Sequence, residues 1–361
     1  MNSSFVEDKY ETRLALPGKG ALEAATLAFL AECGMKVNRA NPRQYLARMD
    51  NMPELEVVFQ RAADIPLLVQ DGDATLGITG YDILAEYRGN GNEESDEDSY
   101  DDDLIILERD LGYGRCRLVV AVPETWIDVS TCTDLWHLAG YYSTHKGRGL
   151  RIATKYPALT GQFLRRHGIT HCKIVSPHGA LEAAPLTGVA DLIVDLTETG
   201  TTLRENHLKL LEDGVVLRSQ ACLIANAHLL QRHEKSLRTA SMMLELIDAR
   251  MHARNRSLLT AYIQSESVDA VQRVCSQLKT PASGSEFQVS SSELSGNLKP
   301  CWYTLSGVVH VGGSASELLE TIALLRSAGA VHVNVTPLTY RFAEKSKSVR
   351  ALRERLKRSG E

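Results

Sequence analysis

The residues best suited to hold an anion follow a short apolar run. Leu192–Val194 predicts a buried strand, and the carboxylate of Asp195 comes directly after it. A loop of small residues, Thr199–Thr202, is followed at Leu203 by a polar segment that predicts a helix start. N–H groups at such a junction lack backbone partners, the helix dipole favours negative charge, and a glycine lets the backbone approach a phosphate. The pattern predicts a phosphate cradle, with Asp195 facing the hydroxyls of a phosphorylated ribose.

The same loop also fits an ordinary strand-to-helix turn, in which threonines cap the helix and no ligand binds. A longer spacing around it favours the anion site, and its members are Glu182, Gly188, Ala190, Ile193, Asp195, Thr199, Gly200, Thr202 and Leu203. This spacing resembles the motif of the ATP phosphoribosyltransferase family, which catalyses the first step of histidine biosynthesis.

The resemblance covers nearly the whole chain. Segments that follow in the family's order are 13–20, 41–45, 59–65, 77–82, 117–123, 151–157 and 218–224. Those most similar to the plant-type branch are 41–45, 179–185, 202–206 and 336–340. The resemblance implies the long form of the family: an α/β core of two periplasmic-binding-protein-like lobes, followed by a C-terminal ferredoxin-like (ACT-like) regulatory domain.

The implied reaction joins N1 of the adenine of ATP to the anomeric ribose carbon of phosphoribosyl pyrophosphate, and pyrophosphate leaves. By analogy with glycosyl transfer, the transition state resembles an oxocarbenium ion. Adenine N1 is a free base at neutral pH, so no strong general base is required. Mg²⁺, bound mainly through substrate phosphates, is the implied charge partner. The resemblance also implies feedback inhibition by histidine and a homo-oligomer, from dimer to hexamer.

The resemblance assigns the family's binding and catalytic roles to the residues at matching positions of this chain. The residues predicted to bind the 5′-phosphate are Thr199, Gly200, Thr201 and Thr202. Asp195 is predicted to hold ribose hydroxyls directly or through water, and Glu182 either contacts the sugar or supports the loop. The residues predicted to contact ATP are Lys19, Gly20, Arg61, Arg117, Lys155 and Tyr156; Lys19 and Gly20 also fit a pyrophosphate contact. The catalytic set is then Asp195, Glu182 and Lys19, while Arg61 and Arg117 also fit surface ion pairs.

Two positions depart from the family pattern. Ala21 stands where many relatives have arginine, and Thr75 stands where many have aspartate. Loss of an anion-binding arginine would weaken nucleotide binding. These departures favour a regulatory homologue, and an architecture that crosses twice between two lobes also serves solute binding. The alternative function is a non-catalytic, two-lobe small-molecule-binding or regulatory homologue. The loop after Asp195 favours the enzyme, because a solute-binding protein needs no phosphate cradle there.

Bulk properties exclude several classes of protein. A net charge of −5 and a pI near 6.1 argue against a dedicated nucleic-acid binder, which carries a basic face. No apolar run reaches the ~20 residues of a membrane span. The seven scattered cysteines fit reduced core thiols in a reducing compartment. The expected location is the cytoplasm, or the plastid stroma if a transit peptide has been removed. His167, His171 and Cys172 offer a weak alternative as a zinc site.

The elements that must position these residues alternate between strand and helix, which predicts a mostly parallel α/β sheet. Lobe I is expected over 1–112 with 212–240 returning to it; its strands are 14–17, 55–59 and 76–78, and its helices 21–33, 65–70 and 82–87. Lobe II is expected over 113–211, and the strands predicted from Arg117 onward are 118–122, 150–153, 173–175, 192–194 and 215–225.

The last third of the chain departs from the strand–helix alternation of the two lobes. A connecting helix is predicted over 229–254, then a β-α-β-β-α-β module over 255–341, which indicates a ferredoxin-like arrangement if the Ser-rich stretch 280–299 contains a strand. A basic tail, 342–361, is predicted to form an amphipathic helix. The carboxylate-rich segment 93–103 is interpreted as a solvated insertion, with metal binding as the alternative.

Overall fold

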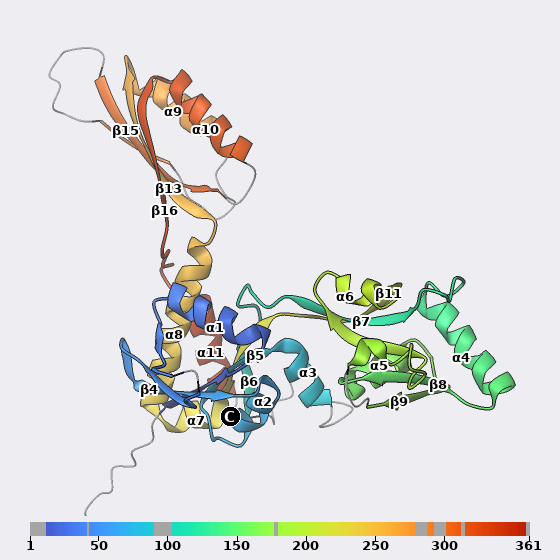
Figure 1. Ribbon diagram of the computed structural model, residues 1–361. Helices are drawn as coiled ribbons and strands as arrows, with labels where there is room; N and C mark the ends of the chain where they lie inside the picture. The colour runs from blue at the N-terminus through green and yellow to red at the C-terminus, as the bar shows by residue number, and fades with distance from the viewer. Residues whose placement is uncertain are drawn as a thin grey trace, which may run out of the picture. The chain divides into compact units, whose positions relative to one another are not determined.

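The computed structural model describes residues 12–41, 43–89, 103–176, 180–278, 287–291, 301–311 and 315–358. It consists of two compact units (Figure 1): a core unit, Met1–Leu244 with Arg350–Glu361, and a C-terminal module, Glu245–Val349. The acidic segment predicted to be a solvated insertion lies outside the described residues, apart from Asp103.

The first sheet of the core unit has seven strands in the order β2-β3-β4-β1-β5-β12-β6. Their bounds are β1 Thr12–Pro17, β2 Val37–Asn38, β3 Leu46–Met49, β4 Met52–Gln60, β5 Leu76–Gly80, β6 Leu104–Glu108 and β12 Ala221–Asn226. Strands β4, β1 and β5 are parallel. The helices that follow these strands are α1 Ala21–Glu32, the short η1 Ala62–Asp64, α2 Ile65–Gln70 and α3 Tyr81–Gly89. The predicted α/β alternation is confirmed, but the sheet is not mostly parallel as expected, because β2 and β3 pair antiparallel on one side and β12 and β6 pair antiparallel on the other.

The second sheet has five strands in the order β11-β7-β10-β8-β9. Their bounds are β7 Cys116–Pro123, β8 Leu150–Thr154, β9 Cys172–Val175, β10 Leu192–Thr197 and β11 Leu208–Ser219. The helices are α4 Cys132–Lys146, α5 Pro157–Arg166, the short η2 Leu181–Ala183 and α6 Thr201–Glu205. Apolar side chains alternate along β10, so Leu192 and Val194 pack in one cluster and Ile193 in another, on opposite faces of the sheet.

The chain crosses between the sheets twice, once from β6 to β7 and once from β11 to β12. The single strand predicted over 215–225 is divided at Gln220, because its first part pairs with β7 and its second part with β5. The return to the first sheet therefore comes later than the boundary expected at residue 212. Two sheets joined by a double crossing form the two-lobe core of the predicted periplasmic-binding-protein type.

The Asp191 carboxylate, just before β10, links two segments of the second sheet: its own and the start of β8. It accepts hydrogen bonds from Arg148 at 2.6 and 2.9 Å, and from the backbone N–H of Arg151 at 2.8 Å. Burial alone raises the pKa of this carboxyl, but the hydrogen bonds from the two arginines outweigh it and hold the pKa well below its ordinary value.

Replacing this carboxylate should destabilise the core unit. Asp191→Ala is expected to lower the free energy of unfolding by about 2 kcal/mol, because hydrogen bonds to charged groups contribute about 1.5–3 kcal/mol each and one arginine stays partly exposed. Since the folded-state pKa is depressed, the difference should be full above about pH 4 and shrink as the pH falls further. Urea unfolding at several pH values measures it; an unchanged midpoint at pH 7 would contradict the assignment.

Two helices replace the single helix predicted over 229–254. They are α7 Ala227–Arg232 and α8 Glu234–Ala253, separated at His233 by extended backbone with φ −116° and ψ 100°. The side chain of Asn226 caps α7 by accepting a hydrogen bond from the Leu229 N–H at 2.9 Å. The polar run after Leu230 had concealed this break.

The C-terminal module confirms the predicted β-α-β-β-α-β order. Its elements are β13 Arg256–Ser265, α9 Val268–Gln277, β14 Gln288–Ser291, β15 Cys301–His310, α10 Ala315–Ser327 and β16 Ala330–Pro337. The sheet order β14-β15-β13-β16 is antiparallel and ferredoxin-like. Helices α9 and α10 cover one face (Figure 1), where Val271 and Leu325 pack against Leu259 and Ile263. The predicted tail helix is α11 Lys347–Arg358, which buries Leu352 and Leu356.

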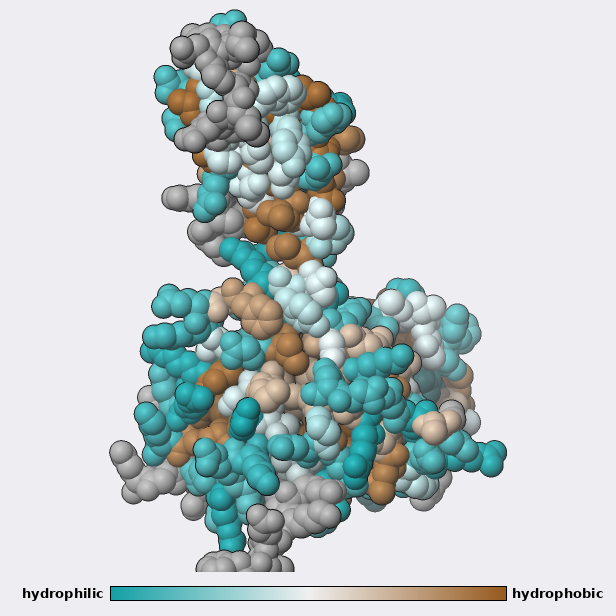
Figure 2. Space-filling view, turned by 90° about the vertical axis from the view of Figure 1, so that its left-hand side faces the viewer, coloured by the Kyte–Doolittle hydropathy of each residue, from teal (hydrophilic) through white to brown (hydrophobic). Residues whose placement is uncertain are grey.

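The surface seen in Figure 2 is largely hydrophilic, with apolar residues scattered between polar ones. In the described part of the chain, no helix combines the length and the apolar character that crossing a bilayer requires. All seven cysteines are free thiols, as expected. Burial raises the pKa of the Cys222 thiol to about 12, so it stays protonated at neutral pH.

Candidate functional site

The carboxyl ends of β8 and β10 bring two predicted site residues together. These strands are parallel neighbours, and Thr154 pairs with Val194. Lys155 and Asp195 are the next residues along each strand, so they lie side by side at one edge of the second sheet. Lys155 is exposed, whereas Asp195 is partly buried. In an open α/β sheet, ligands bind at this edge.

The electrostatic surroundings of Asp195 include two more of the predicted residues. Burial, which is the largest effect, and the nearby Glu182 both raise the pKa of the Asp195 carboxyl. The Leu196 N–H, through a 2.8 Å hydrogen bond, and Lys155 both lower this pKa. The net result is a raised pKa. Glu182 lies on η2, which is anchored because Leu181 and Ala184 pack in the same apolar cluster as Ile193. The structure therefore brings Asp195, Glu182 and Lys155 into one charged group.

The loop after β10 is shaped by threonine hydroxyls. Thr197 Oγ1 accepts a hydrogen bond from the Gly200 N–H at 2.8 Å, and the hydroxyls of Thr199 and Thr201 lie 2.9 Å apart. Gly200 has φ 78°, a left-handed conformation that strains other residues. Thr202 is exposed, and within the described residues neither its N–H nor its hydroxyl donates a hydrogen bond. The loop therefore presents free donors to solvent.

The helix predicted from Leu203 is shorter, and begins earlier, than the sequence indicates. Helix α6 covers Thr201–Glu205 and ends at Asn206. A helix of little more than one turn carries only a small dipole, since the macrodipole sums over aligned peptide units. Any anion at this loop is therefore held by amides and hydroxyls rather than by a long helix.

Two arginines flank the loop across the sheet. Arg117 pairs with Thr197 on the antiparallel neighbour β7, and Arg218 of β11 pairs with Arg117 on its other side. Directly paired residues share a face of the sheet, so both arginines lie on the face of Asp195 and Thr197. Arg117 makes no ion pair among the described residues, so the structure gives no support to the surface-ion-pair alternative. Arg218 was not singled out from the sequence because only the strand pairing brings it beside Arg117.

The first sheet has its own cationic edge. Pro17 at the end of β1 pairs with Gln60 at the end of β4, so the segments carrying Lys19 and Arg61 leave the sheet side by side. Both side chains are exposed, and neither has an ion-pair partner within the described part of the chain. Gly20 caps α1 with φ 86°, a left-handed conformation suited to glycine.

Side-chain hydrogen bonds connect the two sheets near the carboxyl ends of β5 and β8. Asp82 follows the carboxyl end of β5, and Tyr156 follows that of β8. The Tyr156 hydroxyl donates a 2.7 Å hydrogen bond to Asp82 Oδ2, while Ser219 Oγ donates to Oδ1 at 2.5 Å. Glu86 accepts from the Ala158 and Leu159 N–H groups at the start of α5, at 2.8 and 2.9 Å. Burial, then Asp82, raises the pKa of Tyr156, so its hydroxyl remains protonated.

The two departures from the family pattern lie in different places. Ala21 is the exposed first residue of α1, beside Lys19 and Gly20. Thr75 is fully buried at the amino end of β5, where its N–H bonds to the Arg13 carbonyl at 3.0 Å and its carbonyl accepts from Asn226 N–H at 2.9 Å. Since ligands bind at the opposite ends of these strands, Thr75 is a packing residue.

The donor set suits a hard cation bound together with a substrate. Asp195 and Glu182 offer carboxylate oxygens and the loop offers hydroxyls, which are ligands of the kind Mg²⁺ takes. Among the described residues, these two carboxylates belong to no group of three closely spaced protein ligands. The residues therefore fit a Mg²⁺ ion held partly by substrate phosphates.

Several known proteins are similar to this chain. The family model described as HisG: ATP phosphoribosyltransferase matches residues 61–248. The chain is 37% identical to ATP phosphoribosyltransferase 1, chloroplastic, from Arabidopsis thaliana, over 95% of this chain and 80% of that protein. It is 45% identical to ATP phosphoribosyltransferase of Brucella melitensis, over 59% of this chain and 88% of that protein. A solved ATP phosphoribosyl transferase (HisG:HisZ) complex from Thermotoga maritima is 27% identical, with a TM-score of 0.48, over 68% of this chain and 100% of that chain.

The match of the family model and the identity along almost the full chain agree with the motif spacing and with the two-lobe fold. The chain belongs to the ATP phosphoribosyltransferase family, the pentosyltransferases that catalyse the first step of histidine biosynthesis.

Proposed function

We propose that phosphoribosyl pyrophosphate binds at the carboxyl edge of the second sheet. The 5′-phosphate accepts hydrogen bonds from Thr201 and Thr202, while Thr199 and Gly200 fix the loop. The observation that carries this proposal is that the N–H and hydroxyl of Thr202 donate no hydrogen bond among the described residues, on the loop that follows the strand carrying Asp195. Arg117 and Arg218 lie on the same face and add positive charge for the phosphates. We place Arg117 here, not in the ATP site expected from the sequence, because it pairs with Thr197.

ATP binds from the first lobe in this proposal. Lys19 and Arg61 hold its phosphates beside Gly20, and both are exposed cations at the ends of neighbouring parallel strands. Tyr156 lines the junction with its ring, since its hydroxyl is engaged by Asp82. Lobe I is residues 1–112 with the segment after Gln220, and lobe II is 113–219.

The chemistry needs orientation and charge rather than proton transfer. The lone pair of adenine N1 forms a bond to the anomeric carbon, while the bond from that carbon to the pyrophosphate oxygen breaks and its electrons leave with pyrophosphate. Asp195 and Glu182 hold the ribose hydroxyls and place negative charge near the carbon that becomes positive. Lys19 neutralises phosphate oxygens. When bound, Mg²⁺ supplies positive charge to the leaving pyrophosphate.

We further propose that the C-terminal module is regulatory and that histidine inhibits the enzyme through it. The module is a compact unit of its own. The plastid stroma is the proposed location, supported by the chloroplastic name of the Arabidopsis relative. The proposed assembly is a homo-oligomer.

An assay for phosphoribosyl-ATP tests both the proposed transferase activity and the proposed inhibition by histidine. With ATP, phosphoribosyl pyrophosphate and Mg²⁺, we expect turnover that is absent when any one of the three is omitted. Histidine should lower the rate, whereas leucine at the same concentration should not. No turnover would favour the non-catalytic homologue, and a rate that histidine leaves unchanged would remove the regulatory proposal alone.

A further inference from the structure

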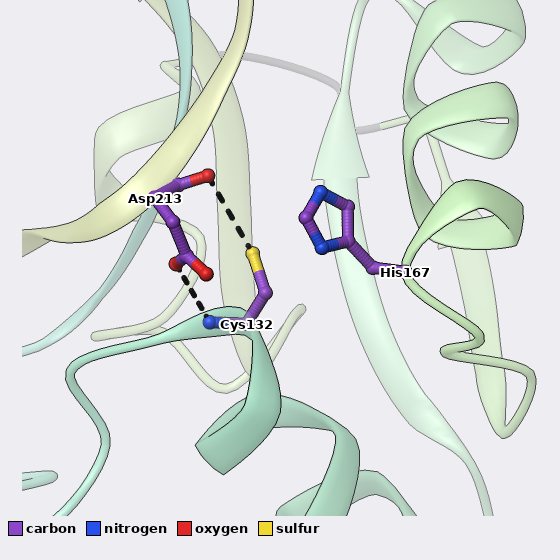
Figure 3. Close-up of side chains that lie close together, drawn as sticks. All are labelled: Cys132, His167 and Asp213. Carbon is purple, nitrogen blue, oxygen red and sulfur yellow. Dashed lines mark hydrogen bonds between the residues drawn. The ribbon is translucent and has the colours of Figure 1, made fainter.

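Cys132, His167 and Asp213 come from distant parts of the sequence and lie together in the second lobe (Figure 3). Their potential ligand atoms, a sulfur, a ring nitrogen and a carboxylate oxygen, all lie within 4.8 Å of one another. Within the described part of the chain, no other three such side chains share this spacing. Neither the family motif nor the proposed reaction uses these residues.

Two of the three side chains are fixed by the fold. Cys132 begins α4, is only 2% exposed and packs in the apolar cluster that contains Leu135 and Leu211. Asp213 lies where the pairing of β11 with β7 shifts its register, between Leu210 and Val215, and such an irregularity redirects a side chain. The Cys132 N–H donates a 2.8 Å hydrogen bond to Asp213 Oδ1, which holds the carboxylate beside the thiol.

The third side chain, His167, is held by its backbone and by a ring contact, but its ring nitrogens are not held. His167 ends α5, where its N–H bonds to the Phe163 carbonyl at 3.1 Å and its ring lies 4.4 Å from the Phe163 ring. The imidazole faces the Cys132 sulfur in Figure 3. It is exposed, and no hydrogen bond to its ring nitrogens occurs among the described residues. A lone pair is therefore available to a ligand.

The arrangement does not suit nucleophilic catalysis. A thiol–imidazole–carboxylate triad needs the carboxylate on the imidazole, which orients the base. Here the carboxylate binds the Cys132 N–H instead, and the thiol lies 3.7 Å from the Asp213 carbonyl oxygen. The buried sulfur is also closed to all but a small reactant.

We propose that Cys132, His167 and Asp213 bind a zinc ion, with water as the fourth ligand. Thiolate, imidazole and carboxylate are the three ligand types that zinc takes in proteins, and thiolate and carboxylate together balance its charge. Bonds of about 2.0–2.3 Å place tetrahedral ligands roughly 3.5 Å apart, so the group closes by about 1 Å on binding. The exposed His167 makes most of that movement. On binding, the Cys132 S–H proton passes to solvent and a zinc–sulfur bond forms.

Zinc at this point would join the end of α5 to the start of α4 and the irregularity of β11, which the hydrogen bond from Cys132 to Asp213 already connects. The expected consequence is greater stability of the second lobe when zinc is present, because a ligand that binds only the folded state stabilises it. This role is independent of phosphoribosyl transfer.

The test uses the full-length protein stripped with chelator and loaded with zinc chloride alone, then dialysed. We expect one equivalent of zinc per chain by elemental analysis, and loss of that equivalent in His167→Ala and in Cys132→Ser. His167 is exposed, so its variant should fold normally. The matched control is His171→Ala, which removes an exposed histidine four residues away and should retain the zinc.

Cobalt(II) in place of zinc identifies the ligands. The parent should show a sulfur-to-cobalt charge-transfer band that is absent from Cys132→Ser, and zinc should raise the melting temperature of the parent but not of His167→Ala. Three results would overturn the proposal: less than a tenth of an equivalent retained, equal retention by His167→Ala, or a cobalt spectrum without thiolate character, which would indicate an adventitious ion only.

Discussion

Asp195→Asn is expected to lower kcat/KM for phosphoribosyl pyrophosphate by about 10²–10³-fold, the range seen when one preorganised electrostatic contact to a transition state is removed. The amide keeps the size of the side chain but loses its charge, which in the proposed site faces the ribose where positive charge develops. Most of the loss should appear in kcat, since the contact strengthens as the bond to pyrophosphate breaks. Steady-state rates with saturating ATP measure it.

The same variant should change the pH profile. Burial, with Glu182 nearby, raises the pKa of Asp195 above its ordinary value of about 3.9, so the rate of the parent should fall as the pH drops through that raised pKa. The Asn variant should lack this acid limb. Glu212→Gln is the matched control, because it removes an exposed carboxylate on β11 of the same lobe and should leave both rate and profile unchanged. An Asn variant as active as the parent would falsify the assignment.

Thr202→Ala is expected to raise KM for phosphoribosyl pyrophosphate by about 10–100-fold with a smaller effect on kcat. A hydrogen bond to a charged group contributes about 1.5–3 kcal/mol, and the 5′-phosphate is bound in both ground state and transition state. KM for ATP should stay within about twofold, because the proposed nucleotide contacts lie on the first lobe. Initial rates measured with each substrate varied in turn give the KM for phosphoribosyl pyrophosphate and the KM for ATP separately.

Thr133→Ala is a close control for this loop variant. Thr133 is likewise exposed and is the second residue of its helix, α4, as Thr202 is of α6. Its loss should leave both KM values unchanged. If the two variants behave alike, or if Thr202→Ala raises KM for ATP instead, the phosphate cannot lie at this loop.

The order of most strands and helices along the chain was predictable from the local pattern of apolar and polar residues. Apolar runs bounded by turn residues predicted the start of β10, which continues through Asp195 to Thr197, and the module order after residue 255, because burial of one face imposes a period on the sequence. Two details were missed because the local pattern continues across each of them. The strand predicted over 215–225 is divided at Gln220 by its different strand partners, and extended backbone at His233 separates α7 from α8.

The sequence by itself determined the family, the fold class and the residue types of the Asp195–Thr202 loop, because motif spacing and periodicity are properties of the chain alone. Tertiary structure decided which of those residues meet. The parallel pairing of β8 with β10 places Lys155 beside Asp195, and antiparallel pairing brings Arg117 and Arg218 to Thr197. Cys132 and Asp213 carry no local signal, and the sequence grouped His167 with His171 and Cys172 instead. The proximity of Cys132, His167 and Asp213 exists only after three distant segments pack around one apolar core.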